Sequence, residues 1–346
     1  MTSRPRFARL QSSSKLIRRC AAALLCAGAM VSSASAENKV DTVLRGLVNP
    51  SSVSFSPDGE LTVCDARGLV VVLKGDQPVN HVTGFDTEHW KSNDEGEKWY
   101  AVGPLSAIWS DSTLIVTDAG KVDGEETLLF FDAKGKSDSG TKTNSVPPTS
   151  DDPADKGEGN LTGMSLSKDG STVYVCGQGF DGKSWVLSAD VNSKELKPLL
   201  SADENGIETN SPMQTVVGEG NSLFVLYSGK GGEADGLIVR WDVATKKPTA
   251  QWTLPGVINP MGLAHIEGNQ FAVVENNWSL EQTNAGRVLV ATLGDEGEAE
   301  VEETGVSLNG PVSCAFGPDD RLYVSQLGEE FDKPVGSVVA IDGLKD

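Results

Sequence analysis

Histidine and carboxylate side chains offer the most direct route to catalysis, and this chain has three histidines, at positions 81, 89 and 265. His265 lies in an apolar segment, and Glu275 follows it within the same predicted hairpin. An imidazole held beside a carboxylate can act as a general base in a lyase or lactonase. His265 and Glu275 are therefore the catalytic candidates. The alternative is that His265 is a core residue or lines a channel.

Asparagines recur at similar places along the chain, each just before an apolar segment. Asparagine is common at such places because it favours turns and caps strand ends. The same side chains could instead form a polar collar that binds a neutral or cationic ligand through their amides. The members of this predicted collar are Asn49, Asn160, Asn210, Asn259 and Asn309.

Aromatic residues gather in the long connection 79–102, which carries Trp90, Trp99 and Tyr100. Aromatic side chains in a loop can bind ligands because they bury large apolar surfaces. The alternative is a lid that packs on the flank of the fold. We predict that these three residues belong to a ligand-binding surface.

Four later loops are rich in acidic residues, at 177–182, 228–236, 275–286 and 326–333. Carboxylates gathered on one rim could hold a calcium ion or a cationic partner, but the spacing of an EF-hand is absent. We predict no metal site and no cofactor, with calcium as the alternative. Three of the acids, Asp235, Glu281 and Glu329, complete the predicted ligand-binding surface. The full set is Asp181, Glu233, Asp235, Glu275, Glu281, Glu329, Glu330 and Asp332.

An internal repeat determines where these residues lie. Six segments begin alike, near residues 49, 103, 160, 211, 259 and 310, each with a run such as Asn49-Pro-Ser-Ser-Val-Ser-Phe55. A polar turn and a β-rich run follow, as in Ser56-Pro-Asp-Gly59 and Leu61-Thr-Val-Cys64. Each such pair predicts a β-hairpin. A repeat of about 50 residues is typical of one four-stranded propeller blade.

The sixth repeat ends with the chain and is too short for a whole blade. Residues 40–44, Val-Asp-Thr-Val-Leu, predict a strand near the start that could complete it. This pairing would join the two ends of the chain and leave no open edge in the ring. The sequence thus predicts an all-β, six-bladed β-propeller closed by the mature N-terminal strand. Residues 134–159, rich in Ser, Asp, Pro, Gly and Lys, predict a flexible insertion.

The first 36 residues have the composition of an export signal. They contain six basic residues and no acidic ones, an apolar stretch at 20–31 and a small-x-small sequence at 34–36. We therefore predict a signal peptide at 1–36, a propeller at 37–346, and a secreted or periplasmic protein. Without the signal, 23 basic residues face 49 acidic ones.

That excess of negative charge argues against nucleic acids and anionic membranes as partners. The sequence after the signal also predicts no membrane span. The expected partner is a small molecule, a glycan or a protein, and the expected state is a monomer.

The repeated pattern is Pro-x-small-apolar-small-bulky, then Pro-Asp-Gly, then a Leu-Tyr-Val type of strand. It resembles NHL-repeat propellers and the gluconolactonase and senescence-marker superfamily over nearly all of residues 40–346. Gluconolactonase-type enzymes hold a divalent cation with one Glu, one Asp and Asn residues at the blade heads. The matching positions here are Val48, Thr162 and Met261. A hard cation needs several oxygen ligands, usually including carboxylates, so the resemblance implies the fold without the metal site.

Two functional hypotheses follow from the sequence, which by itself names no reaction. The first is a propeller that acts as a binding or interaction module for an unidentified ligand. The alternative is a lactonase- or lyase-like hydrolytic enzyme that uses other residues. A cluster of histidine or carboxylate side chains at the mouth of the channel would favour the enzyme.

Overall fold

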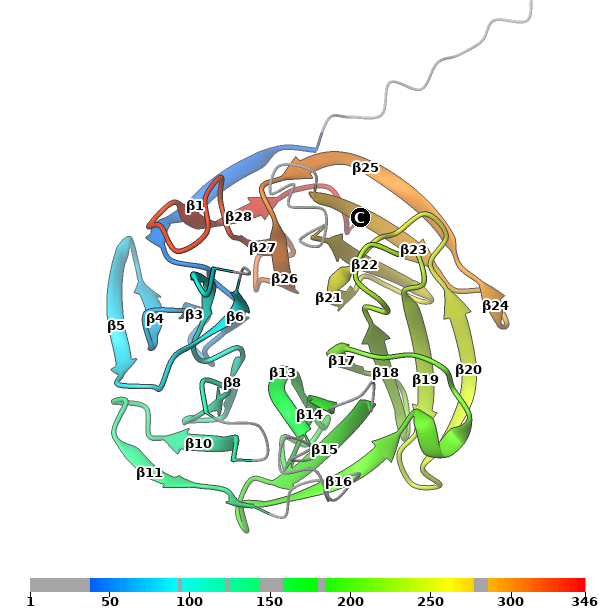
Figure 1. Ribbon diagram of the computed structural model, residues 1–346, viewed down its shortest axis with the longest axis horizontal. Helices are drawn as coiled ribbons and strands as arrows, with labels where there is room; N and C mark the ends of the chain where they lie inside the picture. Colours follow the sequence, from blue (N-terminus) through cyan, green and yellow to red (C-terminus); the bar gives the residue numbers. More distant parts are fainter. Residues whose placement is uncertain are drawn as a thin grey trace, which may run out of the picture. The chain divides into compact units, whose positions relative to one another are not determined.

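The computed structural model describes residues 38–92, 95–121, 125–143, 158–179, 184–276 and 286–345. Residues 37–346 form one unit. In this unit six β-sheets are arranged in a ring around a central axis (Figure 1). The predicted all-β, six-bladed β-propeller is confirmed.

The first three blades follow one another along the chain, each running from the axis outward. Blade one comprises β2 (Ser54–Phe55), β3 (Leu61–Asp65), β4 (Leu69–Lys74) and β5 (Gln77–Thr83). Blade two comprises β8 (Ala107–Ser110), β9 (Thr113–Asp118), β10 (Thr127–Phe131) and β11 (Ser137–Gly140). Blade three comprises β13 (Glu158–Leu166), β14 (Thr172–Gly179), β15 (Ser184–Asp190) and β16 (Glu195–Ser201).

The last three blades complete the ring in the same direction. Blade four comprises β17 (Pro212–Val217), β18 (Ser222–Tyr227), β19 (Leu237–Asp242) and β20 (Lys247–Thr253). Blade five comprises β21 (Pro260–His265), β22 (Gln270–Glu275), β23 (Gly286–Thr292) and β25 (Glu300–Leu308). Blade six comprises β26 (Pro311–Phe316), β27 (Leu322–Gln326), β28 (Gly336–Ile341) and, as its outer strand, β1 (Val40–Leu47).

Strand β1 closes the ring. It pairs antiparallel with β28, so that Val40 lies opposite Ile341 and Leu47 lies opposite Gly336. The last blade therefore takes its outer strand from the beginning of the propeller, as the short sixth repeat predicted. The pairing satisfies the backbone groups that an open edge of β28 would expose.

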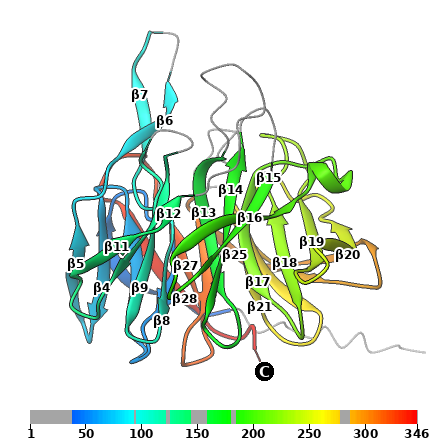
Figure 2. The same cartoon turned by 90° about the horizontal axis from the view of Figure 1, so that it is seen from below.

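Two short strands and one hairpin lie outside the regular blades. Strand β12 (Lys142–Thr143) pairs parallel with β16, and β24 (Gly297–Glu298) pairs parallel with β20. A hairpin of β6 (Glu88–Ser92) and β7 (Lys98–Val102) forms a separate two-stranded sheet that projects from one face of the ring (Figure 2). The insertion predicted at 134–159 contains β11, β12 and the start of β13, and its residues 144–157 lie outside the described residues.

The hydrophobic core lies between adjacent blades. The rings of Phe224 and Trp252 in blade four pack together, and Phe224 also contacts Phe271 of blade five, with ring centroids 4.9 Å apart. The middle strands are covered by neighbouring blades on both faces, and for this reason they are continuous apolar runs without alternation. Cys64 on β3 is one of three buried thiols among the described residues, and burial raises its pKa to about 12. These cysteines pack as small hydrophobic side chains.

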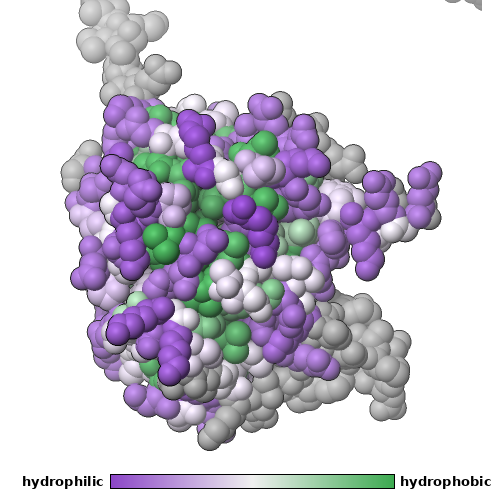
Figure 3. All heavy atoms as spheres, turned by 90° about the vertical axis from the view of Figure 1, so that its left-hand side faces the viewer, coloured by the Kyte–Doolittle hydropathy of each residue, from purple (hydrophilic) through white to green (hydrophobic). Residues whose placement is uncertain are grey.

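The flank of the ring in Figure 3 is covered mainly by hydrophilic side chains, with hydrophobic patches between them. Val79 on the outer strand β5 is one of the few large hydrophobic side chains classed as exposed, at 39%. Isolated apolar residues of this kind are normal on protein surfaces. The one helix in the described part of the chain is a single 3-10 turn, Asp203–Asn205, so no described helix could cross a membrane.

Candidate functional site

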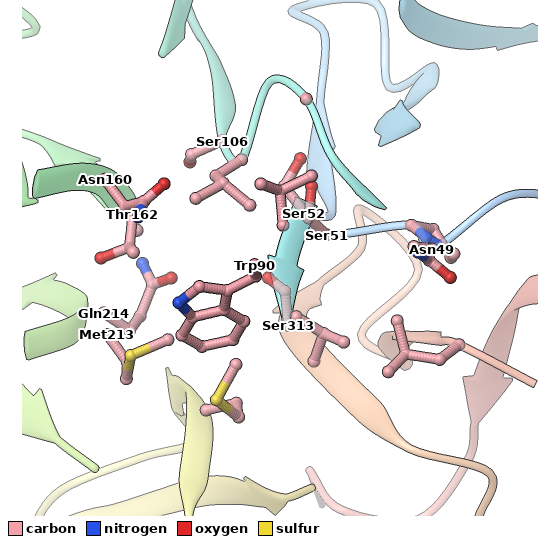
Figure 4. Close-up of a pocket in the computed structure, with 18 of the residues that line it drawn as sticks. Asn49, Ser51, Ser52, Trp90, Ser106, Asn160, Thr162, Met213, Gln214 and Ser313 are labelled. Carbon is pink, nitrogen blue, oxygen red and sulfur yellow. The ribbon is translucent and has the colours of Figure 1, made fainter. Parts of the chain in front are cut away.

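The candidate site is a pocket on the propeller axis, where the starts of the inner strands converge (Figure 4). The empty space at this pocket is about 700 Å³, a volume that includes open solvent. The residue that follows the proline, or its equivalent, at each blade head lines this axial pocket. These six residues are Ser51, Leu105, Thr162, Met213, Met261 and Val312.

The lining of the axial pocket has two chemically different halves. Blades one to three contribute mainly hydroxyl and amide groups, and blades four to six contribute mainly apolar side chains. The polar half is Ser51, Ser52, Ser106, Asn160, Thr162 and Gln178. The apolar half is Met213, Met261, Val312 and Leu327.

Two hydroxyls of the polar half also connect neighbouring blades. Ser51 Oγ donates to the carbonyl of Pro104 at 2.9 Å, and Thr162 Oγ1 donates to the carbonyl of Pro212 at 2.8 Å. Each bond runs from the head of one blade to a blade head further along the ring. The polar wall is therefore held in place by the ring itself, which pre-organises it for a ligand.

Gln214 is the polar residue that blade four adds to the pocket. Its Nε2 donates to the carbonyls of Met164 and Thr215, each at 3.0 Å. These bonds fix the orientation of the amide and direct its oxygen toward Gly163. A Cβ at position 163 would collide with Gln214 Oε1 and with the carbonyl of Met213. The glycine therefore makes the room that the amide occupies.

The predicted asparagine collar is only partly assembled. Asn49, Asn160 and Asn259 start their blades with positive φ angles of 40°, 25° and 51°, a conformation that asparagine tolerates better than most residues. Asn49 and Asn160 line the axial pocket. Asn210 and Asn309 fall one position earlier in the repeat, before Ser211 and Gly310, and are not part of the lining.

Asn259, the remaining member of the predicted collar, does not line the pocket but binds a neighbouring loop. Its Oδ1 accepts a hydrogen bond from Gly232 N and its Nδ2 donates to Lys230 O, so it holds a loop of blade four. Local backbone geometry at the blade entries therefore explains most of the recurrence of asparagine.

The aromatic connection supplies the roof of the pocket. Trp90 on β6 and Tyr100 on β7 both line the pocket, and Figure 4 shows the Trp90 indole directed toward its centre. Burial raises the pKa of the Tyr100 phenol above its usual value. Trp99 lies outside the lining and contacts Phe331 of blade six, with centroids 5.2 Å apart. Two of the three predicted aromatic residues therefore reach the site directly.

The two catalytic candidates are not brought together. In the hairpin of β21 and β22, Glu275 lies opposite Pro260 and His265 lies opposite Phe271, so they occupy opposite ends. Five residues of strand separate the two positions by about 17 Å. The exposed His265 ring has its Nε2 2.9 Å from the carbonyl of Gly268, in the turn that follows. A general acid–base pair of these two side chains is not formed.

Glu275 has structural partners. It is fully buried, accepts a hydrogen bond from Ile258 N at 2.7 Å and forms an ion pair with Arg287. The carboxylate raises the pKa of the Arg287 guanidinium above its usual value. Blade one has a similar arrangement, in which Asp65 accepts a hydrogen bond from Val48 N and pairs with Arg67.

The acidic loops do not form a cation site within the described residues. Asp235 accepts hydrogen bonds from Lys230 N within its own loop, and Glu329 lies exposed in the connection between β27 and β28. Asp181 and Glu281 lie outside the described residues. In the part of the chain that is described, no three His, Cys, Asp or Glu side chains come close enough to hold a metal ion.

The residues at the positions of the family metal ligands do not fit a hard divalent cation. Thr162 and Met261 line the axial pocket, and Val48 is buried beside it. One hydroxyl, one thioether and one isopropyl group cannot replace the carboxylate and amide oxygens that such an ion requires. Any chemistry in the axial pocket must therefore come from other groups.

Sequence reasoning missed the residues that matter most in the lining. The six axis-facing positions form one column of the repeat, which in the sequence alone is informative only as the place of the family metal ligands. Gln214 has no local signal in the sequence, and Asp332, which lies outside the lining, is marked there only as one acid of the predicted acidic loops. Asp332 accepts a hydrogen bond from Tyr100 N across 232 residues of sequence, a contact that only the closed ring creates.

No protein-family model matches this chain, and no curated protein matches it. Solved structures do match. A Thermus thermophilus protein provisionally assigned as an oxidoreductase (glucose dehydrogenase) is 14% identical with a TM-score of 0.60, covering 88% of this chain and 99% of its own. A gluconolactonase from Xanthomonas campestris is 10% identical with a TM-score of 0.57, covering 88% and 90%.

The soluble aldose sugar dehydrogenase of Escherichia coli, in its apo form, is 12% identical with a TM-score of 0.54, covering 88% of this chain and 99% of its own. At these identities the likeness shows the fold alone. Fold and site together define a six-bladed β-propeller whose axial pocket, as far as its lining is described, is uncharged and lies beneath an aromatic hairpin.

Proposed function

We propose that the protein acts on a small, neutral ring compound of the sugar or sugar-lactone class, held in the axial pocket. The observation that carries this proposal is the two-sided lining, with hydroxyls and amides on one half and methionines and aliphatic side chains on the other. A sugar ring has hydroxyls around its edge and C–H groups on its faces. The Trp90 indole offers a flat apolar surface against which such a face can pack.

The charge of the lining supports a neutral ligand. Among the described lining residues there is no Asp, Glu, His, Lys or Arg. A charged ligand entering this pocket would lose its hydration without gaining a counter-ion, which costs on the order of several kcal/mol. A neutral compound instead exchanges water for the hydroxyl and amide groups of blades one to three.

Of the two hypotheses raised by the sequence, the enzymatic one has the better support. The similar structures include a gluconolactonase and two proteins assigned as sugar dehydrogenases. We therefore propose hydrolysis of a sugar lactone as the activity. Binding without turnover is the second candidate, because the buried Tyr100 is the only ionisable side chain of the described lining.

In either case, the described residues would bind and orient the ring. Both N–H groups of the Gln214 amide are held by protein carbonyls, so its oxygen would accept from a ring hydroxyl, and the hydroxyls of Ser106 and Ser313 would donate to a lactone carbonyl. Hydrogen-bond donors held in place in this way can stabilise negative charge that develops on a carbonyl oxygen. The hairpin above them would limit the access of bulk water.

The test is calorimetric titration with D-glucose and D-glucono-δ-lactone, with D-gluconate as a charged control of similar size. We expect both neutral compounds to bind and gluconate to bind at least about tenfold more weakly, equivalent to about 1.4 kcal/mol. Acid release from the lactone above its spontaneous rate, followed in a pH-stat, would distinguish turnover from binding. Binding of gluconate alone, or of none of the three, would contradict the proposal.

A matched pair of variants locates the site. Gln214→Met removes the fixed amide at constant length, and Gln251→Met changes an exposed glutamine on the outer strand β20. We expect Gln214→Met to weaken sugar binding about tenfold and Gln251→Met to leave it unchanged. Equal effects of the two changes would move the ligand away from the axial pocket.

A further inference from the structure

The hairpin of β6 and β7 is the part of the site least supported by the ring. It forms a sheet of only two strands and stands off the face of the propeller (Figure 2). A two-stranded hairpin is marginally stable in water by itself. Its position over the axial pocket must therefore depend on the contacts that its base makes with the blades.

One carboxylate accepts two hydrogen bonds from the base of the hairpin. Asp332, in the connection between β27 and β28, accepts hydrogen bonds from Ala101 N at 2.7 Å and Tyr100 N at 2.9 Å. Asn49 Nδ2 donates to the same carboxylate at 2.7 Å and to Ala101 O at 3.0 Å, and Asp332 N donates to Asn49 Oδ1 at 3.0 Å. Asp332 and Asn49 thus join the hairpin to blades one and six.

Aromatic packing continues from this point to the pocket. The Phe331 ring stacks on Tyr100 with centroids 4.8 Å apart, and Tyr100 contacts Trp90 at 5.5 Å. Trp90 in turn faces the centre of the axial pocket (Figure 4). A change at Asp332 can therefore reach the indole through two intervening rings.

Three residues at this junction have left-handed backbone angles, and at Tyr100 this conformation strains the chain. Asn49, Tyr100 and Asp332 have φ angles of 40°, 60° and 61°, in the left-handed region. This conformation is unfavourable for a bulky residue such as tyrosine and persists only where surrounding contacts enforce it. The strain opposes the hydrogen bonds, so the closed arrangement is one that can be released.

We infer that Asp332 and Asn49 form a latch that positions the hairpin, and with it Trp90, over the axial pocket, so that ligands enter and leave when the latch opens. Asp332 is a positioning residue, because it acts on the ligand through Tyr100 and Trp90. The ligand class in this inference rests on the proposed function. The latch itself rests on the contacts alone, and the two can be tested separately.

Asp332→Asn tests the latch. Asparagine tolerates the left-handed conformation and has the same shape, but its NH₂ group would face an N–H donor where the carboxylate had an acceptor. We expect hydrogen–deuterium exchange in the peptide covering 88–102 to become at least about tenfold faster. The control is Glu330→Gln, which neutralises an exposed carboxylate two residues away. In this variant, exchange in the peptide covering 88–102 should stay at the wild-type rate.

Stopped-flow tryptophan fluorescence with D-glucono-δ-lactone and D-glucose measures the rate constants of ligand binding and release. We expect Asp332→Asn to raise the association and dissociation rate constants together, with a smaller change in Kd. Phe331→Leu, which removes the ring stack and keeps the carboxylate, should act in the same direction if Asp332→Asn does not fold.

Each result decides one of the two ideas. Unchanged exchange of the hairpin in both variants overturns the latch, whatever the protein binds. Faster exchange with unchanged rate constants for a sugar that binds overturns the gating role. Faster exchange in a protein that binds neither sugar supports the latch and contradicts the proposed function.

Discussion

Blades five and six satisfy the same kind of backbone N–H group with different side chains. At the end of β22, Glu275 accepts a hydrogen bond from the N–H of the blade entry and forms an ion pair with Arg287 on β23. At the end of β27, Gln326 accepts the corresponding hydrogen bond and donates to Ser337 on β28. A neutral pair thus replaces an ion pair at the same position.

The comparison shows that charge near the blade heads is structural. Glu275 was a catalytic candidate because it is a carboxylate near the end of an apolar strand, but its place in the blade is that of Gln326. The described groups that line the axial pocket are uncharged. Ion pairs such as Glu275–Arg287 stabilise the blades, and uncharged side chains line the described part of the site.

The largest expected effect comes from Glu275→Gln. The amide can still accept the backbone hydrogen bond, but Arg287 loses its buried counter-ion. Arg287 keeps 33% of its side chain exposed, so the expected loss in the free energy of unfolding is about 2–3 kcal/mol, near the low end for a broken buried pair. Urea denaturation measures this loss. Abolished lactone hydrolysis in a variant of unchanged stability would instead make Glu275 catalytic.

The double variant Glu275→Gln with Arg287→Ser copies the pair of blade six into blade five. The two introduced side chains would be able to form the hydrogen bond that Gln326 and Ser337 form at 2.9 Å. The new pair is neutral, so no charge remains buried without a partner. We expect the free energy of unfolding of the double variant to lie within about 1 kcal/mol of the wild-type value. Most of the stability lost in Glu275→Gln would then be regained. A double variant as unstable as the single one would show that the two blades are not equivalent.

A pH titration separates the axial pocket from the rest of the ring. The described lining has no group that titrates between pH 5 and 8, so sugar binding should be constant over that range. Stability should not be constant, because burial lowers the pKa of His81 on β5 below its usual 6.5. Below pH 6.5 the unfolded chain binds the proton more readily than the folded one, so the free energy of unfolding falls as the solution is acidified.

Thermal unfolding at pH 7 and pH 5 measures this effect, with His81→Gln as the variant that should lose part of the difference. The ring of His81 packs against Trp109, 5.6 Å between centroids, and its buried Nε2 has no hydrogen-bond partner among the described residues. Sugar binding that followed the same pH profile as stability would contradict the expectation that the axial pocket is neutral while the blades contain a titrating histidine.

The smallest effect is expected for His265→Asn. The side chain is exposed, its Nε2 contacts the turn that follows β21, and its ring packs against Phe271. We expect a change in unfolding free energy below about 0.5 kcal/mol and unaltered sugar binding and turnover. A large loss of turnover would place a catalytic centre at the opposite end of the channel from Trp90.

The repeat shows which structural features the sequence alone can predict. The runs that begin at Asn49 and Leu61 are short-range patterns, and each predicts its own hairpin without reference to the rest of the chain. The column of axis-facing residues was equally visible, since position in the repeat corresponds to position in the blade. What the repeat could not give was the partner of each side chain, as the opposite ends taken by His265 and Glu275 show.

The sequence by itself determined the blades, their number and the closure by β1, because hydrophobic patterning and turn chemistry are local and the repeat copies them six times. Only the tertiary structure decided which groups meet. The ring brings Asp332 to Ala101 across 231 residues and places Trp90 over the axis. Such contacts depend on the closed geometry of all six blades, and no local pattern in the chain records them.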